Sequence, residues 1–446
     1  MGKINFLLDR FQSCSNVRAI IFRNIEYSYG DLLEQVWRQL KWLQINGVRA
    51  GDPIILYGDY SPLSVSMLLA LIELDCIVIP LTPEAFEMLE DSLLDVAPKY
   101  ICDVTATQPV LKICPDIPCP VLYGLLVERL SPGLVLFTSG SSGKPKAVVH
   151  DFGKLLQKFH IKRPAMTTIN FLLFDHWGGL NTLLHCLSNL CLIVIPEKRV
   201  PEYICELIEK YGIELLPVTP SFLNMLLLSK SFMGKNLSSL KLITYGAEPM
   251  SSASLLQLNK LFPKIELRQT YGMIELGVLR AKSRSTDSLW VKLGGEGYDT
   301  RVVDGMLQIR ADSAMLGYIN APSPFTDDGY LITGDLVETD GEWIKILGRQ
   351  SDLINVGGQK VYPLEVEATI LDFPEVEDVM VYGEKNLIMG KIVCARIVLK
   401  EPANIRDSRI SILKLCRERL QPYMVPVKIE FVPFIEQSHR LKRKRI

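Results

Sequence analysis

A segment of small and cationic residues is the first place in this sequence where chemistry could occur. It runs from Thr138 to Lys146, reads Thr-Ser-Gly-Ser-Ser-Gly-Lys-Pro-Lys, and lies between two apolar strand-like runs. Glycines let backbone N–H groups approach a polyanion, hydroxyls donate to its oxygens, and lysines neutralise its charge. The spacing of Gly140 and Gly143 fits neither a P-loop nor a dinucleotide fingerprint. The segment predicts a phosphate-binding loop of another kind, and the alternative is a flexible Ser/Gly hairpin turn.

Four further segments place polar or glycine residues after strand-like runs. They are Tyr245–Pro249, Gln269–Glu275, Thr333–Asp335 and Gly348–Glu367. A lone Thr-Gly-Asp is more often an ordinary turn, so this one gains meaning only from its place behind the other segments.

In this order the segments resemble the motifs of the adenylate-forming superfamily, which includes acyl- and aryl-CoA synthetases, peptide-synthetase adenylation domains and firefly-type luciferases. The resemblance covers the chain from about residue 25 to its end. It implies ATP-dependent activation of a carboxylic acid to an acyl-adenylate with release of pyrophosphate. The acyl group would then pass to the thiol of CoA or of a carrier-protein phosphopantetheine. ATP and Mg²⁺ are the implied cofactors.

The resemblance also assigns nucleotide-binding roles to individual residues. The ring of Tyr271 would flank the nucleotide, Asp335 would take both ribose hydroxyls, and Arg349 would reach the ribose. Thr138 and Glu275 would hold Mg²⁺ on the phosphates. The implied nucleotide-binding set is Thr138, Ser139, Gly140, Ser141, Ser142, Gly143, Lys146, Gly246, Ala247, Glu248, Gln269, Thr270, Tyr271, Gly272, Met273, Asp335, Arg349 and Lys442.

A C-terminal lysine would neutralise charge as the carboxylate attacks the α-phosphate. The family takes it from a Pro-x-Thr-x-x-Gly-Lys-x-x-Arg pattern, which is altered in this chain. An ungapped count from Pro426 places Lys442 at the family's Lys and Arg445 at its Arg. A second register places Arg440 at the lysine position, and a solvated basic tail is the remaining alternative. The implied catalytic residues are Lys442, Thr138, Glu275 and His176.

The stretch Phe171–Thr182 occupies the place of the family's first substrate-pocket motif. A His followed by two glycines is common there in acyl- and aryl-CoA synthetases, and the glycines would leave an open channel. The resemblance therefore favours a fatty or aromatic acid. Asp175 keeps amino-acid adenylation open as an alternative, because such enzymes bind the substrate ammonium with an Asp near this point. The implied pocket residues are Asp175, His176, Trp177, Gly178, Gly179, Gly246 and Gly272.

The segment from Gly348 to Glu367 resembles the family's hinge motif. Gln350–Asp352 would be the hinge, and Gly357 with Gly358 would form the thiol channel, because adjacent glycines permit positive φ and close backbone approach. The altered C-terminal motif motivates a third possibility from another class, a nucleotide-binding relic of weak catalytic power.

The elements that would carry these motifs alternate between helical and strand-like patterns. Tyr29–Ile45 repeats apolar residues at helical spacing, and Pro53–Tyr57 and Leu240–Tyr245 are short apolar strands separated by helices. This alternation predicts mainly parallel sheets covered by helices. Short alternating strands between Trp290 and Ile346 predict a small β-barrel-like subdomain.

The expected fold class is therefore α/β plus α+β. A large N-terminal domain, residues 1–348, would bind ATP and the acid, with its β-barrel-like subdomain at the end. Residues 349–352 would be the hinge, and residues 353–446 would form a small mobile C-terminal α+β domain. About one hundred residues suffice for such a unit.

The amino-acid composition limits the classes of partner that this chain is expected to bind. Lys and Arg total 49 against 50 Asp and Glu, so the chain lacks the basic surplus typical of nucleic-acid binding. Ten scattered cysteines without Cys-x-x-Cys spacing argue against a structural zinc site and favour a reducing compartment. Without a visible secretory signal or a bilayer-length apolar run, we expect a cytoplasmic protein without stable membrane insertion. Its expected partners are a small carboxylic acid and an acyl carrier protein.

Overall fold

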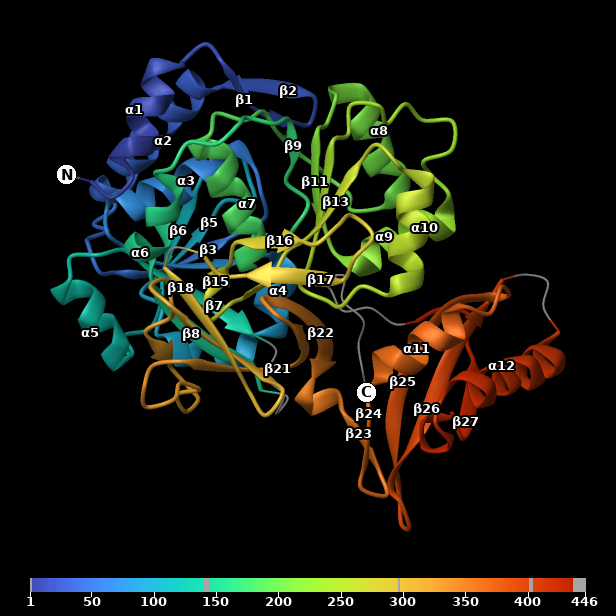
Figure 1. Ribbon diagram of the computed structural model, residues 1–446. Coiled ribbons are helices and arrows are strands. Elements are labelled where there is room, and N and C mark those ends of the chain that lie inside the picture. The colour runs from blue at the N-terminus through green and yellow to red at the C-terminus, as the bar shows by residue number, and fades with distance from the viewer. Residues whose placement is uncertain (1, 139–143, 296, 401–403, 436–446) are drawn as a thin grey trace.

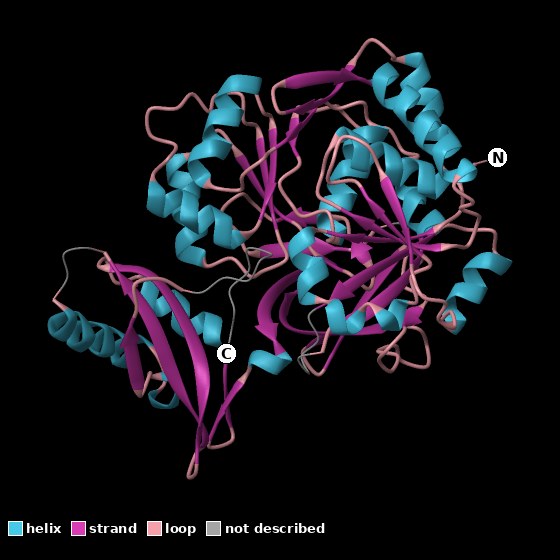
Figure 2. Cartoon of the chain, turned by 180° about the vertical axis from the view of Figure 1, so that it is seen from behind, coloured by secondary structure: helices cyan, strands magenta, loops and turns pink. Residues whose placement is uncertain are grey.

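The structure is a computed structural model that describes residues 2–138, 144–295, 297–400 and 404–435. In Figures 1 and 2 the N-terminal part forms a broad body of sheets and helices, and a smaller C-terminal sheet with its own helices lies beside it. The mainly parallel sheets covered by helices, the antiparallel sheet and the separate α+β unit confirm the expected fold class.

One sheet of the described residues is parallel except at β2, which pairs antiparallel with β1. It supports two of the predicted motifs, because β12 and β13 end where Tyr245–Pro249 and Gln269–Glu275 begin. Its order is β13 (Glu266–Gln269), β12 (Leu242–Tyr245), β11 (Leu215–Val218), β9 (Thr168–Ile169), β10 (Ile193–Ile195), β1 (Arg18–Phe22) and β2 (Ile25–Ser28).

The second sheet carries the predicted phosphate-binding segment between two of its strands. Its centre is parallel, and antiparallel pairs lie on both sides. Its order is β20 (Gly317–Tyr318), β8 (Lys146–Asp151), β7 (Gly133–Thr138), β4 (Ile77–Leu81), β3 (Pro53–Tyr57), β5 (Tyr100–Asp103) and β6 (Val110–Ile113).

The largest hydrophobic core lies between these sheets, where α2, α3 and α7 pack together. Helix α2 begins at a capping box in which Ser28 and Asp31 satisfy each other's backbone N–H groups. Helix α3 is apolar nearly all round because it is buried on all sides. The helices of this part are α1 (Asn5–Ser13), α2 (Tyr29–Ile45), α3 (Pro62–Glu73), α4 (Pro83–Met88), α5 (Val121–Glu128), α6 (Phe152–Leu156), α7 (Trp177–Ser188), α8 (Pro201–Tyr211), α9 (Pro220–Ser229) and α10 (Ser252–Leu261).

The predicted barrel-like subdomain is an antiparallel sheet. The short hairpin β14 (Gly272–Met273) and β15 (Gly277–Val278) leads into it. Its order is β16 (Ala281–Ser283), β17 (Trp290–Leu293), β22 (Trp343–Arg349), β21 (Leu331–Asp340), β19 (Met306–Ala311) and β18 (Tyr298–Val303).

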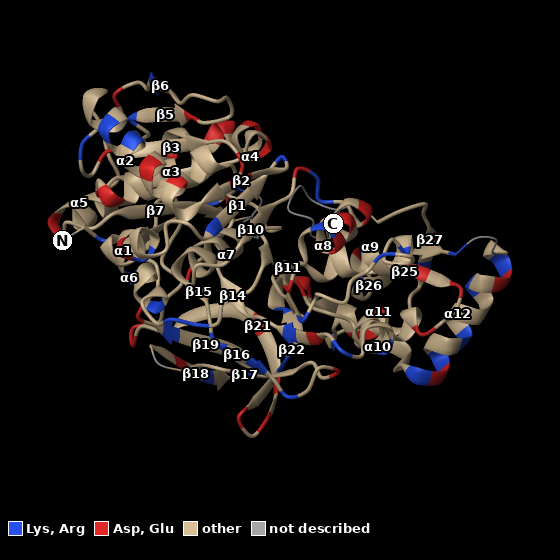
Figure 3. Ribbon diagram, turned by 90° about the horizontal axis from the view of Figure 1, so that it is seen from above, with Lys and Arg blue, Asp and Glu red and all other residues tan. Residues whose placement is uncertain are grey.

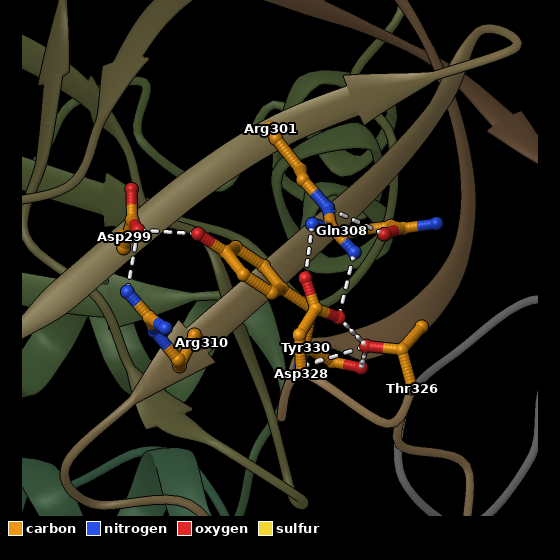
Figure 4. A network of polar contacts seen from close by, with 7 residues as sticks. All are labelled: Asp299, Arg301, Gln308, Arg310, Thr326, Asp328 and Tyr330. Atoms are coloured by element: carbon orange, nitrogen blue, oxygen red, sulfur yellow. Dashed lines mark hydrogen bonds and ion pairs between the residues drawn. The ribbon is translucent and has the colours of Figure 1, made fainter.

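A polar network fastens the turn before β21 to this sheet (Figure 4). The Tyr330 ring lies 3.9 Å from the Arg301 guanidinium and 4.9 Å from that of Arg310. Arg301 also donates to both carboxylate oxygens of Asp328, and this lowers the pKa of Asp328 to about 2. The network fixes the start of β21, the strand that contains the Thr333–Asp335 motif.

The C-terminal unit has a hydrophobic core of its own, formed by its strands with α11 (Pro363–Leu371) and α12 (Ile405–Arg419). A 3-10 turn at Gln350–Asp352 precedes it. Its strand order is β24 (Gln359–Val361), β23 (Ile354–Val356), β26 (Gly390–Leu399) and β25 (Val376–Asn386), with β27 (Lys428–Phe431) paired to β26. The domain boundaries and the hinge stay predictions.

Charged residues of both signs are interspersed over the part of the chain that the structure describes (Figure 3). This mixture of signs is in keeping with the balanced composition of the sequence.

Candidate active site

The first and last residues of the predicted phosphate loop pair with each other across a β-hairpin. Thr138 of β7 lies directly opposite Lys146 of β8 in the antiparallel ladder. Residues 139–143, and with them the predicted ligands Ser139, Gly140, Ser141, Ser142 and Gly143, lie outside the described residues. The hairpin register therefore brings the two ends of the loop together, with a hydroxyl on one side and an ammonium group on the other.

Tyr318 connects this hairpin to the predicted metal ligand. It pairs with Val148 through β20, so its ring lies beside β8. The Lys146 ammonium lies 5.1 Å from the ring centre, and the phenol hydroxyl donates to Glu275 Oε1 at 2.7 Å. Glu275 is only 8% exposed, and burial together with this carboxylate raises the pKa of Tyr318. Lys146, Tyr318 and Glu275 thus form one chain of contacts.

Asn320 fixes the end of the loop that leads into β8. Its carbonyl accepts the backbone N–H of Ala147, and its amide donates to the Pro145 carbonyl at 3.1 Å and to Asp95 at 2.9 Å. Sequence reasoning did not single out Tyr318 or Asn320. The segment Leu-Gly-Tyr-Ile-Asn that holds them was the available signal, because it places a Gly-Tyr pair and an Asn in a region of short strands.

Asp335 is the second buried carboxylate, at 6% exposure. Arg349 Nε lies 2.7 Å from one of its oxygens, and the Tyr271 hydroxyl donates to the other at 2.6 Å. Burial raises the pKa of the Asp335 carboxyl, and the charge of Arg349 and the tyrosine bond oppose that rise. The structure therefore brings together three of the predicted nucleotide-binding residues, with Tyr271 four residues before Glu275.

Two predicted glycines lie where the backbone comes close to another segment. A Cβ at Gly246 would lie 2.3 Å from Thr270 Oγ1, and one at Gly272 would lie 2.8 Å from the Gly277 carbonyl oxygen. Thr270 itself donates twice to the Tyr245 carbonyl. The segments Tyr245–Pro249 and Gln269–Glu275 are thus in direct contact at the ends of β12 and β13. Atoms of Thr270 and Gly277 occupy the space that side chains at Gly246 and Gly272 would need.

The other predicted nucleotide-binding residues of these two segments have different surroundings. Ala247 has a φ of +67°, and the Glu248 carboxylate accepts the backbone N–H and hydroxyl of Ser221 at the start of α9. Gln269 is buried and its backbone N–H donates to Ser283, while Met273 packs beside the core of the antiparallel sheet. Glu248 therefore caps a helix, a structural role that the sequence did not predict.

His150 attaches β8 to the Gln269–Glu275 segment. Its Nε2 lies 2.6 Å from the Ile274 carbonyl oxygen, adjacent to Glu275. The ring is 1% exposed, and burial lowers the pKa of His150 to about 4. The side chain is thus a neutral donor to that carbonyl near neutral pH, and it fixes the backbone that carries Glu275.

The predicted acyl motif forms the start of α7. His176 is the N-cap residue, and its Nδ1 accepts the backbone N–H of Gly178 at 3.2 Å. A ring nitrogen that accepts is unprotonated, so this bond assigns a neutral His176 with its proton on Nε2. Asp175, immediately before it, is 1% exposed.

Trp177 and Gly179 take part in packing. Trp177 is 2% exposed and belongs to the largest core, where its ring lies nearly parallel to that of His150 and edge-on to that of Phe152. A Cβ at Gly179 would lie 2.1 Å from the Leu173 carbonyl oxygen and 2.6 Å from the Tyr60 hydroxyl. The lining of a substrate pocket by Trp177 and the two glycines stays a prediction.

Gly357 and Gly358 form the turn between β23 and β24, with φ of +56° and +88°. Both are exposed. This is the left-handed conformation that adjacent glycines permit, as the sequence predicted. Their role toward a thiol stays a prediction. Lys442 and its alternative Arg440 lie outside the described residues.

The residues present fit a magnesium ion held mainly by phosphates. No group of three or more His, Cys, Asp or Glu in the described ranges could hold a metal alone. Mg²⁺ commonly takes one or two carboxylates and completes its shell with substrate phosphates and water. Glu275 is a buried carboxylate joined through Tyr318 to Lys146 of β8, which lies opposite Thr138. A carboxylate of this kind is the donor that such a shared site requires.

Two family models match the sequence. The model of AMP-binding enzymes matches residues 126–314, and that of the AMP-binding enzyme C-terminal domain matches residues 365–442, together more than half of the chain. The chain therefore belongs to the AMP-binding enzymes of the adenylate-forming superfamily, and it is an enzyme of the acid–thiol ligase class.

Particular relatives are named CoA ligases. The chain is 26% identical to indoleacetate–CoA ligase of Aromatoleum aromaticum, over 93% of this chain and 91% of that protein. It is 25% identical to 2-succinylbenzoate–CoA ligase of Listeria monocytogenes, over 99% and 98%. Among solved structures it is similar to the anthranilate CoA ligase AuaEII in complex with anthranoyl-AMP, with a TM-score of 0.82, 20% identity, and coverage of 100% and 95%.

Among the described residues, no helix combines the length and the apolar character that crossing a bilayer requires.

The two glycines of the acyl motif provide a matched stability test. Gly179→Ala should lower the melting temperature markedly, because its methyl group would meet backbone oxygen at 2.1 Å. Gly178→Ala should be far milder, because the nearest atoms are side-chain atoms of Leu172 and His176 at 3.1 and 3.2 Å. Thermal unfolding of both variants checks this expectation, and equal losses of stability would contradict it.

Proposed function

We propose that this protein activates an aromatic or other apolar carboxylic acid with ATP and transfers the acyl group to the thiol of CoA. In the first step the acid's carboxylate attacks the α-phosphate, an acyl-adenylate forms and pyrophosphate leaves. In the second step the thiol attacks the acyl carbon, a thioester forms and AMP leaves. The family membership and the names of the relatives support this reaction, and the residues of the site supply its parts.

One observation carries the proposal above the others. A single seven-residue segment, Gln269–Glu275, connects two buried carboxylates: Tyr271 donates to Asp335, and Glu275 accepts from Tyr318 beside the phosphate hairpin. A nucleotide needs ribose ligands and phosphate ligands a few ångströms apart. The contacts of this segment support a site in which Asp335 would serve the ribose and Glu275 the phosphate side.

The nucleotide would be held by two kinds of interaction. Asp335 and Arg349 would engage the ribose, and the Tyr271 ring would flank the base. The loop between Thr138 and Lys146 would hold the phosphates through backbone N–H groups and hydroxyls. Mg²⁺, when bound to Glu275 and the Thr138 hydroxyl, would neutralise phosphate charge.

The acid would be bound at the start of α7. His176, as a neutral ring with its proton on Nε2, offers a hydrogen-bond donor without adding positive charge to the pocket. The apolar environment of Phe174 and Trp177 around this helix start favours an aromatic or aliphatic acid. Asp175 motivates the alternative, an amino acid whose ammonium group this carboxylate would bind, with a carrier protein as acceptor.

The C-terminal unit would supply the lysine of the first step and the channel of the second. We propose that residues 1–348 and 353–446 are two domains that reorient about residues 349–352. Lys442 would face the α-phosphate during adenylation, and the Gly357–Gly358 turn would face the thiol during transfer. Positive φ at both glycines supports close passage of a pantetheine arm along this turn.

Substrate class is tested by ATP–pyrophosphate exchange with panels of aryl, fatty and amino acids. We expect exchange with aryl or fatty acids, followed by CoA consumption with the same acids. Exchange with amino acids alone would overturn the proposal in favour of carrier-protein loading. Absence of exchange with every acid would favour a catalytically inert nucleotide-binding protein.

A pair of variants tests whether Lys442 or Arg440 is the catalytic cation. Lys442→Ala should lower the exchange rate at least about 100-fold, because a positioned charge that acts in the transition state is lost. Arg440→Ala, two residues away, should leave the rate within about twofold of the parent, as expected for a solvated surface charge. The reverse result would assign the catalytic position to Arg440.

Tyr318 is expected to act as a positioning residue for Glu275. Tyr318→Phe keeps the ring beside Lys146 but removes the hydroxyl that donates to the carboxylate at 2.7 Å. Removing one such bond should lower kcat/KM for ATP about tenfold and raise the Mg²⁺ concentration needed for half-maximal exchange. The matched control is Tyr330→Phe, which also loses a bond to a carboxylate, that of Asp299, but lies outside the site. An unchanged Mg²⁺ requirement in Tyr318→Phe would contradict this role.

A further inference from the structure

The most exposed apolar side chains in the described residues lie together at the tip of one hairpin. Leu387 is fully exposed and Ile388 is 90% exposed, and Met389 beside them is 41% exposed. The hairpin consists of β25 and β26, the two longest strands of the C-terminal unit, and its tip extends away from the rest of the chain (Figure 1). Water-exposed aliphatic side chains in such a group are unfavourable unless they have a partner.

The turn itself does not require these apolar residues. Asn386 accepts the backbone N–H groups of Ile388 and Met389 through its side-chain oxygen, and Gly390 adopts a φ of +74°. Asn and Gly thus supply the geometry, as they do in most tight turns. The three residues between them could be polar without loss of the turn, so their apolar character calls for another explanation.

The tip is held rigidly against the neighbouring glycine turn. The Gly357 N–H donates to the Met389 carbonyl at 2.8 Å, and a Cβ at Gly357 would lie 2.9 Å from the Met389 methyl group. Gly358 donates to Asn355 in the same turn. Two adjacent turns therefore form one rigid edge of the unit.

Lysines surround this apolar tip. Lys385 and Lys391 lie directly opposite each other in the ladder, one residue outside Asn386 and Gly390. Lys360 lies on β24, the strand that leaves the neighbouring glycine turn. Within the described residues none of the three has an ion-pair partner, while the nearby acid Glu384 is paired with Lys428 at 2.9 Å. The tip is therefore apolar at its apex and positively charged just behind it.

We propose that this tip docks the C-terminal unit reversibly on an anionic lipid surface. Leu387 and Ile388 would enter the boundary between headgroups and acyl chains, and the three lysines would remain at the level of the phosphates. A specific protein interface buries about 800 Å² on each partner, with an apolar centre inside a polar rim. A convex tip of three side chains is too small for such a centre, whereas a soft lipid surface accommodates it and complements its charge.

Vesicle sedimentation of the full chain tests this proposal. The probes are vesicles of phosphatidylcholine alone and of phosphatidylcholine mixed with phosphatidylserine. We expect binding to the mixed vesicles, weakening as salt is raised, and little binding to the neutral ones. Leu387→Ser with Ile388→Ser should weaken binding about tenfold or more, and Lys385→Gln with Lys391→Gln should remove most of the preference for the mixed vesicles.

The matched control is Val121→Ser with Leu125→Ser, which alters exposed apolar residues on α5 and should leave binding unchanged. Parallel thermal unfolding shows whether each variant folds. Absence of binding to mixed vesicles, or equal binding by the Leu387/Ile388 variant, would overturn the proposal. So would a finding that these two substitutions impair only acyl transfer to a phosphopantetheinyl carrier protein. Binding requires no catalysis, so its outcome is independent of the exchange assays.

Discussion

The burial of two carboxylates, Glu275 and Asp335, is the constraint on which the rest of the site depends. Removing a carboxylate from water is costly unless hydrogen-bond donors or an opposite charge replace the lost solvation. Here each carboxylate receives a tyrosine hydroxyl, and Asp335 is also paired with Arg349. Arg349 lies opposite Asp335 within the antiparallel sheet, whereas Tyr318 belongs to the second sheet and Tyr271 follows β13 of the first. Elements of three sheets therefore meet around the two carboxylates. The same contacts join Asp335, the predicted ribose ligand, to the segment that carries Glu275, the predicted metal ligand.

The sequence allowed accurate prediction of those features that depend on local pattern. The helix expected at Tyr29–Ile45 and the strand expected at Pro53–Tyr57 have those bounds in the structure. The start of α12 at Ile405 is harder to predict, because its first turns are polar and follow an Asn404 cap rather than an apolar repeat. Tyr318 and Asn320 could not be predicted, since their partners lie far away along the chain and no local spacing encodes such contacts.

The acyl motif shows how one residue pattern can have two physical causes. Two glycines after His176 were interpreted as an open channel, by resemblance. The structure shows that Gly179 also meets a packing requirement, since the Leu173 carbonyl occupies the space of a side chain. A glycine that is required by close backbone contact says little about the ligand beside it. Assignment of the acid therefore depends on His176 and its neighbours more than on the glycine pair.

The pairing of Arg349 with Asp335 has a consequence for the coupling between nucleotide binding and domain movement. Arg349 is the last residue of β22 and directly precedes the 3-10 turn at Gln350–Asp352. A ribose that took up Asp335 would compete for the carboxylate that holds this arginine. Thermodynamic linkage makes this coupling reciprocal. If ribose binding changes the freedom of the connecting turn, movement of that turn changes the affinity for the nucleotide by the same coupling free energy. Release of AMP and reorientation of the C-terminal unit would then be two expressions of one coupled equilibrium.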